Sequence, residues 1–181
     1  GTSSGPTVVS YSGAPVAVTD NTPAGINIVV PVSGVGNISD LNFSFDGTVG
    51  SADPASTTVG FNHSWVGDII VKLTSPGGTT VTIFDRPGVP TSTVGCNNNN
   101  LFQLALNDDG GLPAVETQGS PTSPGCNTAN AFPTGNFSPN NALSAFDGQN
   151  ADGNWTINVS DNATGDTGSV RAFSLRFNSG N

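Results

Sequence analysis

Two neighbouring aspartates, Asp108 and Asp109, are the residues whose type and spacing best suit metal chemistry. They are followed by Gly110 and Gly111, and two adjacent carboxylates repel one another unless water or a cation lies between them. A tight turn also exposes backbone carbonyl oxygens, and calcium takes carboxylate and carbonyl oxygens as ligands. The same four residues could equally form an ordinary turn. Asp108 and Asp109 are therefore candidate calcium ligands, and the turn is the alternative interpretation.

Hydrolytic chemistry has little support in the chain. It needs a side chain that exchanges a proton near neutral pH, and His63 is the single histidine. One histidine with two distant cysteines gives no closely spaced pair of zinc ligands. Some of the 13 acidic residues could form a carboxylate pair for glycoside hydrolysis, but six of them stand beside glycine, where turn residues are expected. We interpret His63 as a residue that orients a loop before a strand, and we expect no catalytic residues.

Two cysteines, Cys96 and Cys126, lie in polar segments rich in Gly, Asn and Pro. In an exported protein two such cysteines most simply form a disulfide. This bridge would pin a long loop and would contribute about 3–4 kcal/mol if it acts by restricting the unfolded chain. The alternative is two free thiols, and the sequence favours the disulfide.

Charge is scarce and one-sided along the chain. Charged residues make up 9% of the 181 residues, and 13 acidic against 4 basic side chains give a net charge of −9. Such a surface repels phosphate backbones and anionic lipids, which argues against nucleic acid and membranes as partners. Low charge with many neutral polar residues is typical of exported β-domains, so we expect a secreted, extracellular and monomeric protein.

The length fits one domain. Because the chain contains no Met and starts with Gly1-Thr2-Ser3-Ser4-Gly5-Pro6, we interpret it as a piece of a longer polypeptide. We expect a linker over residues 1–12, a domain over 13–178 and a frayed tail over 179–181. No apolar run is long enough to span a membrane.

Apolar and polar residues alternate in short segments, which predicts strands that each bury one face. The segments are 26–30, 41–45, 69–74, 81–83, 155–160 and 173–177. One buried face per strand is typical of antiparallel sheets, so the predicted fold class is an all-β antiparallel sandwich. Turn residues predict hairpins over Ser75–Thr79 and Asp161–Gly168.

Three segments resemble the P domain, also called the P/Homo B domain, of proprotein convertases and bacterial extracellular subtilisin-like or metallo-proteases. They run from Ile38 to Phe43, from Asn62 to Thr79 and from Leu143 to Leu175. The second contains the string His63, Gly67-Asp68 and Ser75-Pro76-Gly77-Gly78-Thr79, and the order and spacing match over about residues 15–178. Segments 46–60, 97–100 and 117–128 depart from the family pattern as enlarged loops. The resemblance implies a jelly-roll-like, galactose-binding-like sandwich.

The resemblance also implies roles for single residues. Asp68, in the turn Gly67-Asp68, would accept backbone N–H groups or bind a cation, so it joins Asp108 and Asp109 as a candidate metal ligand. Related bacterial domains carry an acidic pair at the position of Asp108 and Asp109. The residues expected to shape the fold are His63, Gly67, Trp155, Asp161 and Asp166.

A P domain carries no catalytic residues. The resemblance therefore implies a non-catalytic accessory domain of a secreted protease, subtilisin/kexin-like or similar. It would assist the folding, stability or substrate engagement of the catalytic protease domain in the same polypeptide, and it would bind calcium. The alternative is an autonomous extracellular module that binds carbohydrate or protein. The alternative predicts clustered exposed aromatic residues, whereas Trp65 and Trp155 both begin apolar alternations and are expected at the core or at its edge.

Overall fold

The computed structural model describes residues 5–119 and 130–179 of the chain. Strands dominate this part of the chain, and its helices are three short 3-10 turns, η1 (Val66–Asp68), η2 (Val115–Gly119) and η3 (Leu143–Phe146). The all-β antiparallel sandwich predicted from the alternating segments is confirmed. Cys126 lies outside the described residues, so the disulfide between Cys96 and Cys126 stays a prediction.

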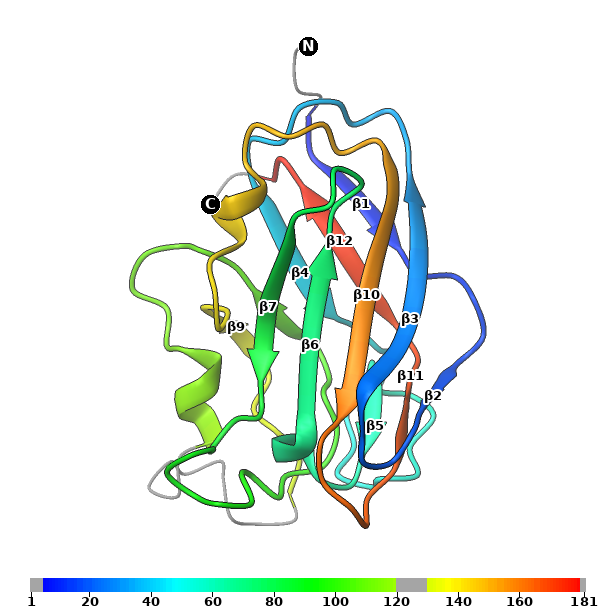
Figure 1. The fold of residues 1–181 in the computed structure, drawn as a ribbon, viewed down its shortest axis with the longest axis vertical. Helices are drawn as coiled ribbons and strands as arrows, with labels where there is room; N and C mark the ends of the chain where they lie inside the picture. Colours follow the sequence, from blue (N-terminus) through cyan, green and yellow to red (C-terminus); the bar gives the residue numbers. More distant parts are fainter. Residues whose placement is uncertain (1–4, 120–129, 180–181) are drawn as a thin grey trace.

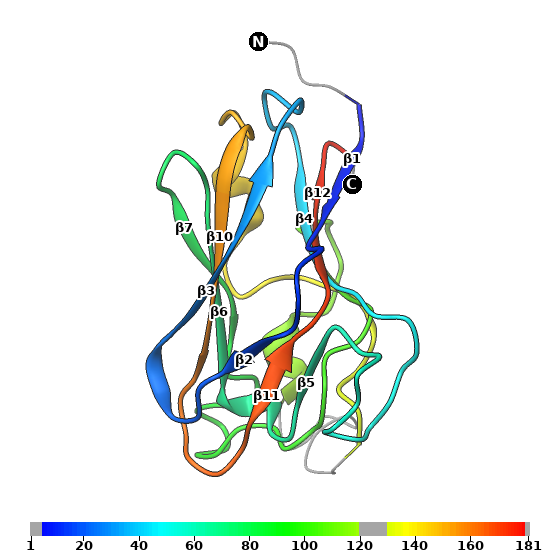
Figure 2. The same ribbon diagram turned by 90° about the vertical axis from the view of Figure 1, so that its right-hand side faces the viewer.

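Two main sheets form the layers of the sandwich, as Figures 1 and 2 show. One sheet contains, in order across it, β1 (Thr7–Ser10), β12 (Phe173–Phe177), β4 (Leu41–Phe45), β8 (Leu104–Leu106) and β9 (Gly135–Phe137). The other contains β3 (Thr22–Val32), β10 (Gly153–Asp161), β6 (Ile69–Thr74) and β7 (Thr80–Asp85). All neighbouring strands in them are antiparallel except β8 and β9, which are parallel.

A smaller third sheet closes one end of the sandwich, at the bottom of Figure 2. It contains β2 (Val16–Val18), β11 (Gly168–Val170) and β5 (Phe61–His63), all antiparallel. The 3-10 turn η1 lies at the same end, directly before β6, whereas η3 lies at the opposite end (Figure 1). Residues placed at these two turns are therefore far apart in the molecule.

The core is built from the apolar positions of the alternating segments. Phe43 and Phe45 on β4 face Leu175 and Phe173 on β12, and all four side chains are fully buried. Trp155 on β10 is also buried, and its ring packs against those of Phe146 and Phe177. Because side chains of a strand alternate between faces, the polar residues between these positions lie on the outer face of the sheet.

Two predicted boundaries are wrong. Thr7–Ser10 were predicted as linker, but they form β1 and pair with β12. The segment Asp161–Gly168 was predicted to be a hairpin, but it carries the chain from β10 in one sheet to β11 in another. The physical reason is that β10 already has β3 and β6 on its two edges, so no edge is left for the strand that follows. The hairpin over Ser75–Thr79 is confirmed, since it joins the antiparallel neighbours β6 and β7.

Candidate functional site

His63 and Asp161 form a buried pair between β5 and β10. The His63 Nε2 atom lies 2.8 Å from Asp161 Oδ2, and the backbone N–H of Trp65 donates a hydrogen bond to His63 Nδ1 over 2.9 Å. A nitrogen that accepts carries no proton, so the neutral ring has its proton on Nε2 and donates it to Asp161. Both ring nitrogens are thus engaged, and neither is left to activate a nucleophile. This geometry gives His63 a role in positioning the backbone.

Two further predicted residues, Asp68 and Asp166, lie close to this pair. Asp68 is 2% exposed, its Oδ1 lies 3.9 Å from Arg86 Nη2, and its Oδ2 has no hydrogen-bond partner within residues 5–119 and 130–179. Burial, and then the charges of Asp161 and Asp166, raise the pKa of Asp68 to about 7. Asp166 accepts a hydrogen bond of 2.7 Å from the Ser64 hydroxyl. With Asp20, whose charge also acts on Asp68, these residues make up the lower acidic group (Asp20, Asp68, Asp161 and Asp166).

The Asp108–Asp109 pair lies at the other end of the sandwich. Asp108 accepts hydrogen bonds from the backbone N–H groups of Leu143 (3.0 Å) and Ser144 (2.6 Å), at the start of η3. The structure therefore does not bring Asp68 together with Asp108 and Asp109. Instead it brings in Asp40, whose Oδ2 is buried without a hydrogen-bond partner in the described part of the chain.

Asp147 completes this second cluster, which we name the upper acidic group (Asp40, Asp108, Asp109 and Asp147). Burial raises the pKa of Asp40, and the charges of the other three residues raise it further. Burial and the charge of Asp108 likewise raise the pKa of Asp147. Across residues 5–119 and 130–179, however, no three His, Cys, Asp or Glu side chains are arranged to hold a metal ion. Asp40 and Asp147 were not predicted, because nothing in the sequence shows that they approach Asp108.

Gly67 explains why the turn before β6 needs glycine. A Cβ atom at this position would lie 2.4 Å from the backbone nitrogen of Cys96 and 2.7 Å from the carbonyl carbon of Gly95. The backbone N–H of Gly67 also donates to the Cys96 carbonyl over 2.8 Å. The two chain segments therefore touch through their backbones, and Cys96 is fully buried at this contact.

We expect Gly67→Ala to lower the free energy of unfolding by about 1–3 kcal/mol, because the methyl group forces these backbones apart. Urea unfolding measures the change. Gly77→Ala is the matched control, since a Cβ at Gly77 would meet its nearest neighbour at 3.6 Å. Equal stability of the two variants would contradict this account of the turn.

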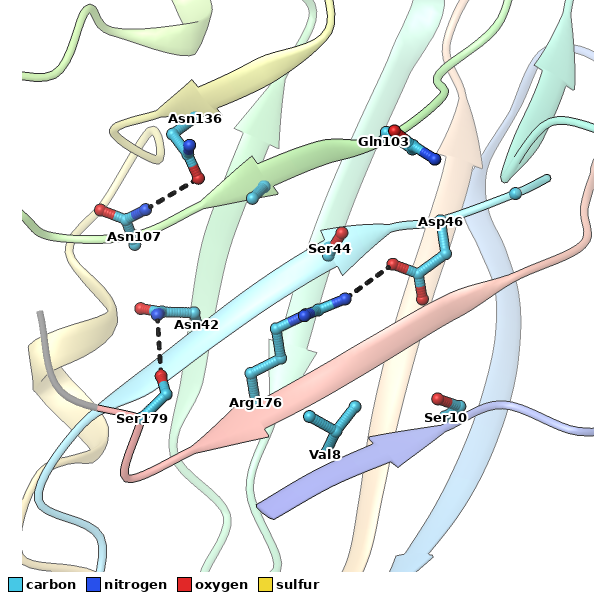
Figure 3. Close-up of a pocket in the computed structure, with 12 residues that line it drawn as sticks. Val8, Ser10, Asn42, Ser44, Asp46, Gln103, Asn107, Asn136, Arg176 and Ser179 are labelled. Atoms are coloured by element: carbon cyan, nitrogen blue, oxygen red, sulfur yellow. Dashed lines mark hydrogen bonds and ion pairs between the residues drawn. The ribbon is translucent and has the colours of Figure 1, made fainter. Parts of the chain in front are cut away.

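A broad polar hollow covers the outer face of the five-stranded sheet (Figure 3). Its volume is about 670 Å³. Arg176 and Asp46 form an ion pair of 3.3 Å across it. The remaining lining is mostly neutral hydrogen-bonding side chains: Ser10, Asn42, Ser44, Gln103, Asn107, Asn136 and Ser179. Among the residues that the structure describes, none forms a hydrogen bond with Asn42 Oδ1 or Arg176 Nε. Such a surface suits a polar, uncharged chain molecule.

Comparisons with known proteins found a matching family model and solved structures with a similar fold. The family model described as the proprotein convertase P-domain matches residues 122–177. The crystal structure of the Aeromonas sobria serine protease in complex with the chaperone ORF2 has a TM-score of 0.51 and 15% identity, covering 97% of this chain and 26% of that one. The crystal structure of the serine protease of Aeromonas sobria has a TM-score of 0.51 and 13% identity, with the same coverage. At these identities the structures show a common fold, and this chain spans about a quarter of their length. A comparison with curated proteins finds no match.

Proposed function

We propose that this chain is the accessory domain of a secreted serine-type protease. The proposal starts from the match of residues 122–177 to the proprotein convertase P-domain, which confirms the resemblance seen in the sequence. A P domain is a non-catalytic accessory domain, and that family match is the observation that carries the proposal. The domain would assist the folding, stability or substrate engagement of a catalytic domain in the same polypeptide. The engaged nitrogens of His63 support this proposal, because the ring serves the backbone and a carboxylate.

Secretion is part of the same proposal. The low content of charged residues, 9%, and the excess of acids suit an extracellular domain. Within the described ranges, no helix has the length and apolar character needed to cross a membrane.

The proposal is tested in the polypeptide that carries this chain. Deletion of residues 7–178 should lower the amount of active protease in the culture medium, and Gly67→Ala should lower it partly. The purified chain alone should not hydrolyse casein. Protease that is equally abundant, active and heat-resistant without the domain would overturn the accessory role, and casein hydrolysis by the chain alone would overturn its non-catalytic character.

We also propose that calcium binds at the upper acidic group. Its four carboxylates repel one another, and the oxygen of Asp40 without a partner is the type of atom that calcium prefers. At most two of these carboxylates would bind the ion directly, since no three of them are arranged as ligands, and backbone carbonyl oxygens and water would supply the other ligands.

At a calcium concentration about 100-fold above the Kd, binding to the native state alone adds about 2.7 kcal/mol, which corresponds to a rise in melting temperature of roughly 5–10 °C. Thermal unfolding with calcium and with chelator measures this rise. Asp109→Asn should abolish the rise, and the exposed Asp53→Asn should preserve it. Asp108 is not substituted, because its side chain also holds the start of η3. For each variant, the melting temperature with calcium is compared with that of the same variant in chelator. A rise that Asp109→Asn leaves unchanged would contradict the assignment.

A second candidate function is an autonomous module that binds carbohydrate or protein. The polar hollow of Figure 3 is the observation that favours it. This function predicts that the chain alone is retained on an immobilised neutral polysaccharide or extracellular protein. Arg176→Ala with Asn107→Ala should then abolish the retention.

A further inference from the structure

A second, smaller cavity lies at the lower end of the sandwich, beside the lower acidic group. Its volume is about 230 Å³. Its wall consists of Trp65, Asp68, Arg86, Thr93, Val94, Ala163, Thr164 and Asp166. These residues come from η1 and the residue before it, the segment after β7 and the turn between β10 and β11, which meet at the bottom of Figure 1. The cavity is separate from the polar hollow and from the upper acidic group.

Asp68 is the feature of this cavity that points to a ligand. The residue is only 2% exposed, it lines the cavity, and no described residue forms a hydrogen bond with its Oδ2. A buried carboxylate without partners is costly, so such groups normally have a cation or donor beside them. Arg86 does not fill this role, because its guanidinium lies 3.9 Å from Oδ1 and its Nε donates to the Gly67 carbonyl over 2.9 Å.

The charge around the cavity is predominantly negative. Asp68 and Asp166 line the cavity together with Arg86, and the charges of Asp161 and Asp20 also act on Asp68. The whole chain adds to this field with its net charge of −9. Such a field attracts cations and repels phosphates and carboxylates. The ligand is therefore a cation.

The residues that line the cavity suit a guanidinium group better than a metal ion. In the described part of the chain no group of three possible ligands is arranged around a metal ion. The Trp65 indole is held in the wall by its Nε1–H, which donates to the Val94 carbonyl over 2.7 Å. A planar guanidinium stacks on an indole face and forms paired hydrogen bonds with a carboxylate. Thr93 and Thr164 add hydroxyl groups that can accept further N–H groups.

We propose that this cavity binds an arginine side chain of a partner polypeptide, with Asp68 and Asp166 facing the guanidinium and Trp65 beside it. This assignment is independent of the accessory role, since it concerns a site that this chain builds from its own residues.

NMR titration of the full chain tests the proposal. The chain has two tryptophans, so Trp65 reports on the cavity and the buried Trp155 is an internal control. The probe is a capped Gly-Arg-Gly peptide, with capped Gly-Lys-Gly and Gly-citrulline-Gly as comparisons. We expect the arginine peptide to shift the Trp65 indole signal with a Kd of about 1 mM or below, and to leave the Trp155 signal unchanged. Lysine should act more weakly, and citrulline, which is uncharged, should not act.

Asp166→Asn should weaken the binding by about tenfold, since a charged hydrogen-bond partner is replaced by a neutral one. Asp109→Asn removes one charge from the distant upper acidic group and should leave the affinity unchanged. Asp68→Asn should also weaken binding, and an unchanged Trp155 signal in that variant reports that the fold is kept. Absence of a Trp65 shift, equal shifts with citrulline or lysine, or an equal loss in Asp109→Asn would overturn the proposal. Displacement of the peptide by calcium at the Trp65 signal would assign the cavity to a metal instead.

Discussion

Asp161→Asn should destabilise the fold by about 2–4 kcal/mol although it preserves the volume of the side chain. Asp161 is fully buried and accepts from three sides: from His63 Nε2, and from the backbone N–H groups of Asn21 (3.4 Å) and Ala163 (3.2 Å). An asparagine side chain has one oxygen and one NH2 group, whereas both oxygens of Asp161 accept from N–H groups. In Asp161→Asn the NH2 group must therefore point at an N–H group, and two donors then oppose each other.

The histidine cannot relieve this conflict by changing tautomer. If the His63 proton moved to Nδ1, Nε2 could accept from the amide that the substitution introduces, but Nδ1–H would then face the backbone N–H of Trp65. Every arrangement therefore leaves one buried hydrogen-bonding group unsatisfied.

Urea unfolding at constant pH measures the loss. Asp53→Asn is the matched control, because Asp53 also accepts from the N–H two residues ahead but lies in an exposed turn, and its loss should stay within about 1 kcal/mol. A double-mutant cycle with His63→Gln should give a coupling energy above about 1 kcal/mol. If Asp161→Asn is as mild as Asp53→Asn, the pair does not hold this end of the sandwich.

The second large effect is a loss of stability as the pH rises from about 4 to 8. Burial raises the pKa of Asp68 to about 7 and that of Glu116 to about 8. In this pH window the folded chain retains protons that the unfolded chain has released, so the free energy of unfolding falls with rising pH and levels off above the folded pKa values. One pKa unit corresponds to about 1.4 kcal/mol, and we expect a fall on the order of 2–3 kcal/mol for Asp68, less than the full shift because water and side-chain rearrangement relieve part of it.

Neutral variants separate the two contributions. Asp68→Asn should be more stable than the natural chain at pH 8 and similar to it at pH 5, and Glu116→Gln should behave in the same way because its oxygen can still accept from the N–H of Asp85. Urea unfolding at several pH values measures the slopes, and Asp53→Asn controls for net charge. A stability that rises between pH 5 and pH 8, or a slope unchanged in both neutral variants, would contradict this explanation.

The layers of the fold could be predicted from the sequence because alternation records which face of a strand is buried. Phe43 and Phe45 face the core, and the residues between and beside them, Ser44 and Asn42, face the polar hollow. The same reasoning places Arg176 on the outer face. Strand order could not be predicted, because alternation does not specify which edge of β10 is filled first, and the predicted hairpin at Asp161–Gly168 failed for this reason.

The candidate sites were predicted only in part. Asp108 and Asp109 were recognised as an adjacent pair, but Asp40 and Asp147 approach them through contacts between remote segments, which no local pattern records. The separation of Asp68 from Asp108 and Asp109 likewise depends on which ends of the sandwich η1 and η3 occupy. The cavity beside Trp65 is formed by three remote segments and has no sequence signal.

The positions of β10 and β12 also determine the order of events during folding. Each lies between two strands that come from the first half of the chain: β10 between β3 and β6, and β12 between β1 and β4. Pairings between such remote segments form slowly, because a long stretch of chain must be closed before any contact forms. Among the described strands, the early strands β1 and β3 have no neighbour in their sheets other than these late ones. We therefore expect the sandwich to form in one late step, after residue 177 has emerged from the ribosome, and a chain truncated before residue 173 to remain unfolded.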